Sequence, residues 1–121
     1  MKRIILLAFL CTTTLVMAQR INHVQEAIAN YDYEAALTLI AKEKPTIPLL
    51  LQKGKAQRGL GMNTEALSTY QEIITNDTAN TRAYIEAAEC CRSLAKYQQA
   101  LKYYEQALDL NPEKKYVRIQ Y

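Results

Sequence analysis

The chain repeats part of itself at a fixed spacing. Residues 65–74, Glu-Ala-Leu-Ser-Thr-Tyr-Gln-Glu-Ile-Ile, return 34 residues later as residues 99–108, Gln-Ala-Leu-Lys-Tyr-Tyr-Glu-Gln-Ala-Leu. A period of this length is typical of stacked repeat units, each of which buries its apolar face only against its neighbours. Chains of this kind bind other molecules more often than they catalyse reactions. The repeat therefore predicts an array of small units with a binding role.

Apolar residues at intervals of three and four predict that these units are helical. One such stripe lies between Thr81 and Ala95. A second runs from Ala100 to Leu108 and stops before Pro112, because proline cannot continue a helix. The short connection between the two stripes predicts an antiparallel hairpin. Apolar residues never alternate with period two for long, so we expect an all-α chain.

Two earlier hairpins are predicted on the same plan. Gly59 and Gly61 are expected to end the first helix of the middle hairpin, since glycine tolerates a positive φ. The first hairpin is offset by 30 residues instead of 34 and begins with a less regular helix over about residues 19–30. Pro45 is expected to end one helix there, and Pro48 to occupy the first turn of the next.

The first eighteen residues have the pattern of a secretory signal peptide. Lys2 and Arg3 precede an apolar run from Ile4 to Met17, and Ala18 supplies the small residue before a cleavage site. A run of this length is too short to cross a bilayer, which needs about 20 residues. We therefore predict cleavage after Ala18 and no membrane span afterwards, with an uncleaved anchor as the alternative.

Charge and cysteine content exclude several classes of function. Removing Lys2 and Arg3 leaves 13 of the 15 basic residues against 12 acidic ones, a net charge of +1, and the charges are interspersed, so no nucleic-acid partner is expected. Cys90 and Cys91 are adjacent, and neighbouring α-carbons about 3.8 Å apart are too close for an unstrained disulfide. We expect packed thiols, or a bond to another chain as the alternative. No metal or cofactor is predicted.

These residues resemble the tetratricopeptide repeat family, a 34-residue helix–turn–helix. Ala100, Tyr104, Ala107 and Pro112 match its second-helix pattern of small, aromatic and small residues followed by proline. The resemblance implies antiparallel hairpins stacked as a right-handed α-solenoid. It divides the chain into a signal peptide (1–18), a domain of about three repeats (a degenerate one at 19–45, then 47–80 and 81–112) and a partial capping helix or truncated next repeat (113–121).

Alternation of small and large side chains supports the stacking independently. Tyr70 and Tyr104 are expected to fill the spaces between hairpins, while Ala66 and Ala100 let the helices approach closely.

No catalytic group is predicted. His23 has no nucleophilic partner at a recognisable spacing, and the carboxylates of Glu86 and Glu89 stand within one helical turn of Arg82 and Arg92, with which they are expected to pair. The chain is therefore expected not to be an enzyme.

The resemblance implies that the first helix of each repeat lines a concave, peptide-binding face. Carried onto this sequence, the exposed candidates for partner binding are Leu51, Lys55, Arg58, Arg82, Ile85, Glu89 and Arg92. Arg58 and Arg92 lie one period apart, which favours an acidic partner, although ordinary solvated charge is an equal alternative. The clamp that grips chaperone C-termini is not expected, because Ile21, Leu51 and Ile85 stand where it needs lysine.

Two functional hypotheses follow. In the first, the chain is an exported, periplasmic scaffold of a Gram-negative bacterium that binds a protein or peptide on its concave face. In the second, it is an N-terminal spacer or dimerisation segment of a longer exported protein whose activity lies downstream.

Overall fold

The computed structural model describes residues 2–112, and all regular structure within this range is helical. The helices are α1 (Lys2–Ala29), α2 (Tyr33–Ile40), α3 (Ile47–Gly59), α4 (Asn63–Asn76), α5 (Thr81–Ser93) and α6 (Tyr97–Leu110). The predicted helix over 113–121 lies outside the described residues.

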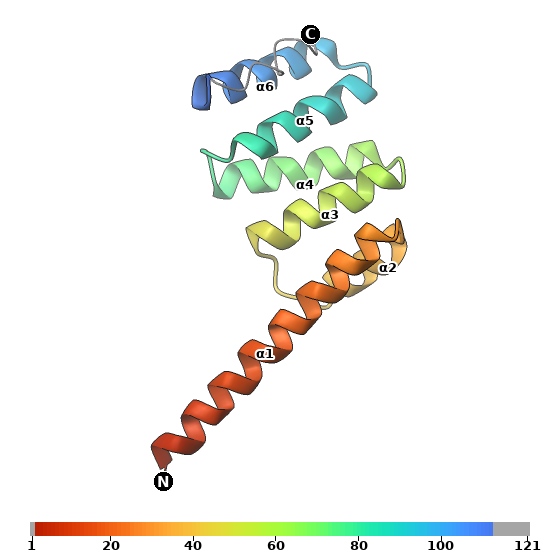
Figure 1. Ribbon diagram of the computed structural model, residues 1–121. Helices are drawn as coiled ribbons and strands as arrows, with labels where there is room; N and C mark the ends of the chain where they lie inside the picture. The colour runs from red at the N-terminus through yellow and green to blue at the C-terminus, as the bar shows by residue number, and fades with distance from the viewer. Residues whose placement is uncertain (1, 113–121) are drawn as a thin grey trace.

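The six helices form three antiparallel hairpins that stack one on the next (Figure 1). Within the hairpins, α1 packs on α2, α3 on α4 and α5 on α6; between hairpins, α2 packs on α3 and α4 on α5. Each helix therefore touches mainly its neighbours in sequence, as expected of a helical-repeat solenoid. The predicted all-α fold of stacked helical hairpins is confirmed.

All three hairpins turn in the same way. The second residue after the first helix has a positive φ in each hairpin: 60° at Tyr31, 75° at Gly61 and 60° at Ala95. The amide of the following residue donates back across the turn to a carbonyl five residues earlier. The three equivalent bonds, each 2.8 Å long, run from Asp32 to Ala27, from Met62 to Gln57 and from Lys96 to Cys91. This is the Schellman arrangement. The turns fall 30 and 34 residues apart, matching the spacing of the sequence repeats.

Side chains and one proline begin several of the helices. Side chains cap α2, α3 and α5, where Asp32, Thr46 and Asn80 accept from amides of the first turn. Pro48 lies in the first turn of α3, which confirms its predicted role. The prediction for Pro45 is wrong, because α2 already ends at Ile40 and Pro45 lies in the connection that follows.

The core is built from alternating small and large side chains. Tyr70 and Tyr104 are each 1% exposed, while Ala66 and Ala100 are also buried within the same cluster. Gly54 completes the pattern, since a Cβ there would overlap the Tyr70 ring. The predicted packing of aromatic knobs against small residues is confirmed, and it explains why α3 and α4 lie close enough to bury a tyrosine between them.

Gly59 has a different role from the predicted one. Its φ is not positive, and Leu60 and Gly61 complete the turn instead. A Cβ at position 59 would overlap the ring of Tyr33 at the start of α2. Gly59 therefore provides room for an aromatic ring of the preceding hairpin.

The N-terminal part of α1 lies apart from the stacked hairpins (Figure 1). The helix runs without a break through Ala18, and every residue from 14 to 23 is exposed. Among residues 14–112, Val24, which is 1% exposed, is the first buried residue. None of the described helices combines the length and the apolar character that crossing a membrane requires.

Candidate functional site

The seven candidate residues lie on α3 and α5, the first helices of the second and third hairpins. They differ in exposure. Lys55, Arg82 and Arg92 are exposed, Leu51 and Arg58 are partly buried, and Ile85 and Glu89 are buried. The expectation that all seven are exposed is therefore wrong for Ile85 and Glu89.

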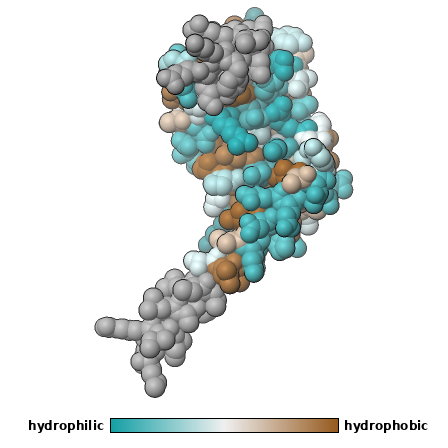
Figure 2. All heavy atoms as spheres, viewed as in Figure 1, coloured by the Kyte–Doolittle hydropathy of each residue, from teal (hydrophilic) through white to brown (hydrophobic). Residues whose placement is uncertain are grey.

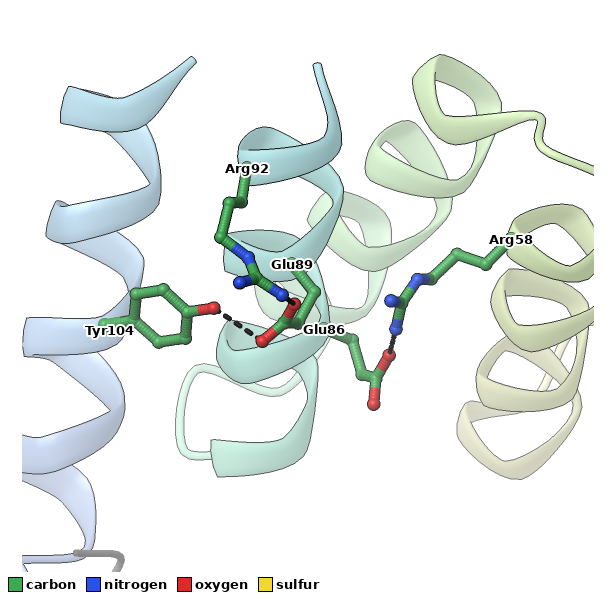
Figure 3. Close-up of polar contacts among 5 residues, drawn as sticks. All are labelled: Arg58, Glu86, Glu89, Arg92 and Tyr104. Carbon is green, nitrogen blue, oxygen red and sulfur yellow. Dashed lines mark hydrogen bonds and ion pairs between the residues drawn. The ribbon is translucent and has the colours of Figure 1, made fainter. Parts of the chain in front are cut away.

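Arg58 forms an ion pair that joins the two first helices. Its guanidinium donates from Nη1 to the Glu86 carboxylate across the boundary between hairpins (Figure 3). Burial, the largest single effect, would lower the pKa of Arg58, but the charge of Glu86, the hydrogen bond to it and smaller contributions from Cys90 and Tyr70 together outweigh burial and raise the pKa. The expected pairing of Glu86 with Arg82 is wrong, because the structure turns Glu86 toward Arg58. Arg58 is thus already bound to a carboxylate of its own chain.

Glu89 is the centre of a second polar cluster, which ties α5 to α6. One carboxylate oxygen accepts from the Tyr104 hydroxyl at 2.6 Å, and the other accepts from Arg92 at 2.7 Å (Figure 3). The predicted pairing of Arg92 with Glu89 is confirmed. Burial and the hydrogen bond to Glu89 raise the pKa of Tyr104, so its hydroxyl stays a donor at neutral pH. Because both of its oxygens are engaged, Glu89 serves the fold, since a buried carboxylate needs such donors.

The two remaining cations of the candidate set face solvent. Lys55 and Arg82 make no ion pair with any side chain of residues 14–112. Beside them, Leu51 packs against the cluster that contains Ile85. The face of α3 and α5 thus presents the partly exposed Leu51 and two cations that no carboxylate of residues 14–112 neutralises.

A pocket of about 380 Å³ adjoins this face at Lys55. It lies between α1 and α3 and is also bordered by Tyr31 and Tyr33 from the first turn and by Gln52 of α3. Sequence reasoning missed these three residues. The signal was present at Tyr31, since a tyrosine stands where the later hairpins have Gly61 and Ala95.

The surface carries no broad apolar area on the side seen in Figure 2, where hydrophobic atoms form small separate patches among hydrophilic ones. Cys90 and Cys91 are both free and buried, and burial raises the pKa of Cys90 to about 11. Both thiols are therefore protonated at neutral pH. No group of three metal-ligating side chains lies together in the part of the chain that the structure describes.

Comparisons with known proteins agree with this geometry. Residues 81–114 match the tetratricopeptide repeat family. No curated protein matches the chain in sequence. Among solved structures, the chain is similar to PcrH in its crystal structure with the chaperone binding region of PopB. The TM-score is 0.77 at 18% identity, and the alignment covers 87% of this chain and 90% of that one.

At this identity the likeness shows the fold, and the PcrH match extends over most of the described hairpins. The family match coincides with α5, α6 and the turn between them. The chain therefore carries a tetratricopeptide repeat at residues 81–114, set in a solenoid of stacked helical hairpins.

Proposed function

We propose that this chain is a non-catalytic scaffold that binds a protein or peptide partner along the face of α3 and α5. The observation that carries the proposal is the pair of solvent-facing cations, Lys55 on α3 and Arg82 on α5, together with the partly exposed Leu51 of α3. Such a face offers hydrophobic contact together with charge that has no internal counterpart. The match of PcrH, seen in complex with a region of PopB, supports a peptide or protein partner for a fold of this shape.

The structure changes which cations are expected to contact the partner. Arg58 and Arg92 are bound to Glu86 and Glu89, so a partner would have to break an existing ion pair to reach either of them. Lys55 and Arg82 carry no such cost. We therefore expect charge reversal at Lys55 and Arg82 to weaken binding directly.

A capture experiment tests the proposal. The chain without residues 1–18 is immobilised, exposed to envelope extract, and compared with the Lys55→Glu/Arg82→Glu variant. Lys102→Glu, at an exposed site on α6, is the matched control for a reversed charge. Loss of the same bound protein from the double variant alone supports the proposal, and equal recovery by all three chains refutes the assignment to this face.

Export to the periplasm of a Gram-negative bacterium is part of the same proposal. It is supported by the signal-like residues 1–18 and by the exposure of Leu15, Val16 and Met17 at 62%, 44% and 51%. Of the residues that cleavage after Ala18 would remove, those from 14 to 18 are all exposed. N-terminal sequencing of the protein from a periplasmic fraction should begin at Gln19; an intact N-terminus in a cytoplasmic fraction would contradict export.

A second candidate is the spacer or dimerisation segment. It is favoured by the outer face of α6, where Leu101 is 40% exposed although the equivalent Leu67, covered by α5, is 5% exposed. End-to-end association of two chains would bury this face. Sedimentation equilibrium showing a dimer that Leu101→Glu dissociates would support it, and a monomer at all concentrations would refute dimerisation.

A further inference from the structure

The pocket between α1 and α3 differs in charge from the other pockets near it. Its lining includes Gln25, Ile28, Tyr31, Tyr33 and Gln52, and Lys55 is the one charged residue among the described residues that border it. The pocket on the far side of α3, by contrast, contains Glu43, Lys53 and Glu72. A cavity with a cation and several neutral hydrogen-bond donors, but no acid, is complementary to an anionic group.

The boundary between α3 and α5 shows, by comparison, why the pocket between α1 and α3 is open. The offset of 30 residues between the first two turns places Ile28 where α3 has Arg58. The offset of 34 between the next two turns places Gln52 where α5 has Glu86. Between α3 and α5, the Arg58–Glu86 ion pair spans the gap. Between α1 and α3, the equivalent residues are uncharged and cannot form this bridge.

Tyr31 places an exposed aromatic ring at this end of the pocket, at a turn position whose positive φ it shares with Gly61 and Ala95. Its backbone has a φ of 60°, and its side chain is 78% exposed. The left-handed region costs a non-glycine residue about 1–2 kcal/mol, and burial of the ring does not compensate for this. The ring instead stands edge-on to Tyr33, with centroids 6.3 Å apart and planes at 76°. Gly59 lets the Tyr33 ring lie against α3.

We propose that this pocket binds an acidic side chain of the peptide partner, and this deepens the proposed function on which it rests. The carboxylate pairs with the Lys55 ammonium and accepts from the Gln52 amide, while its methylene groups lie against the Tyr31 and Tyr33 rings. The partner thereby supplies a carboxylate between α1 and α3. Glu86 supplies the corresponding carboxylate between α3 and α5, where it pairs with Arg58. The tyrosines exclude water from one side of the ion pair, which strengthens it.

The test uses an array of dodecapeptides of varied sequence, printed beside copies in which Asp and Glu are replaced by Asn and Gln. The chain without residues 1–18 is the probe, and the affinities of the strongest ligands are measured by fluorescence anisotropy. We expect acidic peptides to bind more tightly than their neutral copies. Lys55→Gln and the isosteric Gln52→Glu should each weaken binding about three- to tenfold, and Lys55→Gln should remove the preference for acid.

Tyr31→Gly separates a binding role from a folding role. Glycine relieves the backbone strain, so this variant should melt at a higher temperature and yet bind the acidic peptides less tightly. Lys53→Gln, on the opposite side of the same helix, is the matched control and should bind like the unaltered chain.

Equal affinity for acidic and neutral peptides, or unchanged binding by Lys55→Gln and Tyr31→Gly, overturns the inference. If peptides bind and only Arg82→Gln weakens them, the proposed function stands while the acidic pocket does not. If no peptide binds to the chain, both the pocket and the peptide-binding face are refuted.

Discussion

The hairpin turns allow the free-energy cost of a positive φ to be measured by two opposite substitutions. Gly61 and Ala95 occupy the same station in successive turns, with φ values of 75° and 60°. A Cβ at position 61 would meet no atom within 4 Å, and Ala95 is exposed. Exchanging glycine and alanine at these two positions therefore changes the backbone preference with little effect on packing. Both positions lie outside the helices, so helix propensity does not enter either.

The expected size follows from two opposing contributions. Placing alanine in the left-handed region lowers the stability of the fold by about 1–2 kcal/mol. Glycine lowers it by about 0.4–1 kcal/mol relative to alanine, because glycine gives the unfolded chain more conformational entropy. Ala95→Gly should thus stabilise the fold by about 0.5–1 kcal/mol, and Gly61→Ala should destabilise it by a similar amount. For a chain of this size the shifts in Tm are about 2–8 °C, upward and downward respectively.

Urea titration and thermal melting followed by far-UV circular dichroism measure both variants. The two substitutions should cancel in the double variant, since the turns lie in different hairpins and share no contact partner. A loss of stability in Ala95→Gly, or a gain in Gly61→Ala, would refute the reasoning from the turns.

Four further outcomes are expected. Tyr104→Phe removes a donor from the buried carboxylate of Glu89 and should cost about 1–3 kcal/mol in the free energy of unfolding; a urea midpoint equal to that of the unaltered chain would contradict the buried cluster. Cys90 and Cys91 should not react with a thiol reagent such as DTNB until the chain unfolds, and prompt reaction in native buffer would contradict their burial. Because the folded chain keeps the Cys90 proton to about pH 11, against 9.0 for an ordinary thiol, it binds more protons than the unfolded chain in this window. Stability measured in urea should therefore fall as pH rises from about 9 to 11, by about 1–3 kcal/mol for this group, and a flat profile would contradict the shift. Deleting residues 1–18 should change Tm by less than about 2 °C, because residues 14–18 are all exposed; a large drop would show that this segment packs on the fold.

Much of the fold was predictable because helices and turns depend on neighbours close in sequence. The spacing of apolar residues predicted the hairpins, and the 34-residue period predicted that Tyr70 and Tyr104 fill equivalent places. Gly61 at the turn and Pro48 in the first turn of α3 followed from the backbone preferences of glycine and proline. Even the shortened first repeat, offset by 30 residues, reappears in the positions of the turns.

The candidate face was predicted less completely, because its chemistry depends on contacts between hairpins. The period placed Arg58 and Arg92 at equivalent stations, but their partners differ: Arg58 binds Glu86 on the next first helix, and Arg92 binds Glu89 on its own. Helical spacing alone favours partners within one turn, so the cross-hairpin pair with Glu86 could not be inferred from it.

The sequence by itself determined that the chain forms helical hairpins, where the later hairpins turn, which residues form the core stripe and that the units stack. Only the tertiary structure decided that Glu89 is buried, that Gly59 makes room for Tyr33, and that a pocket stays open between α1 and α3. The reason is physical. Periodicity specifies positions along one helix, whereas burial and ion pairing depend on how far apart two packed hairpins lie and on which side chains reach across the gap.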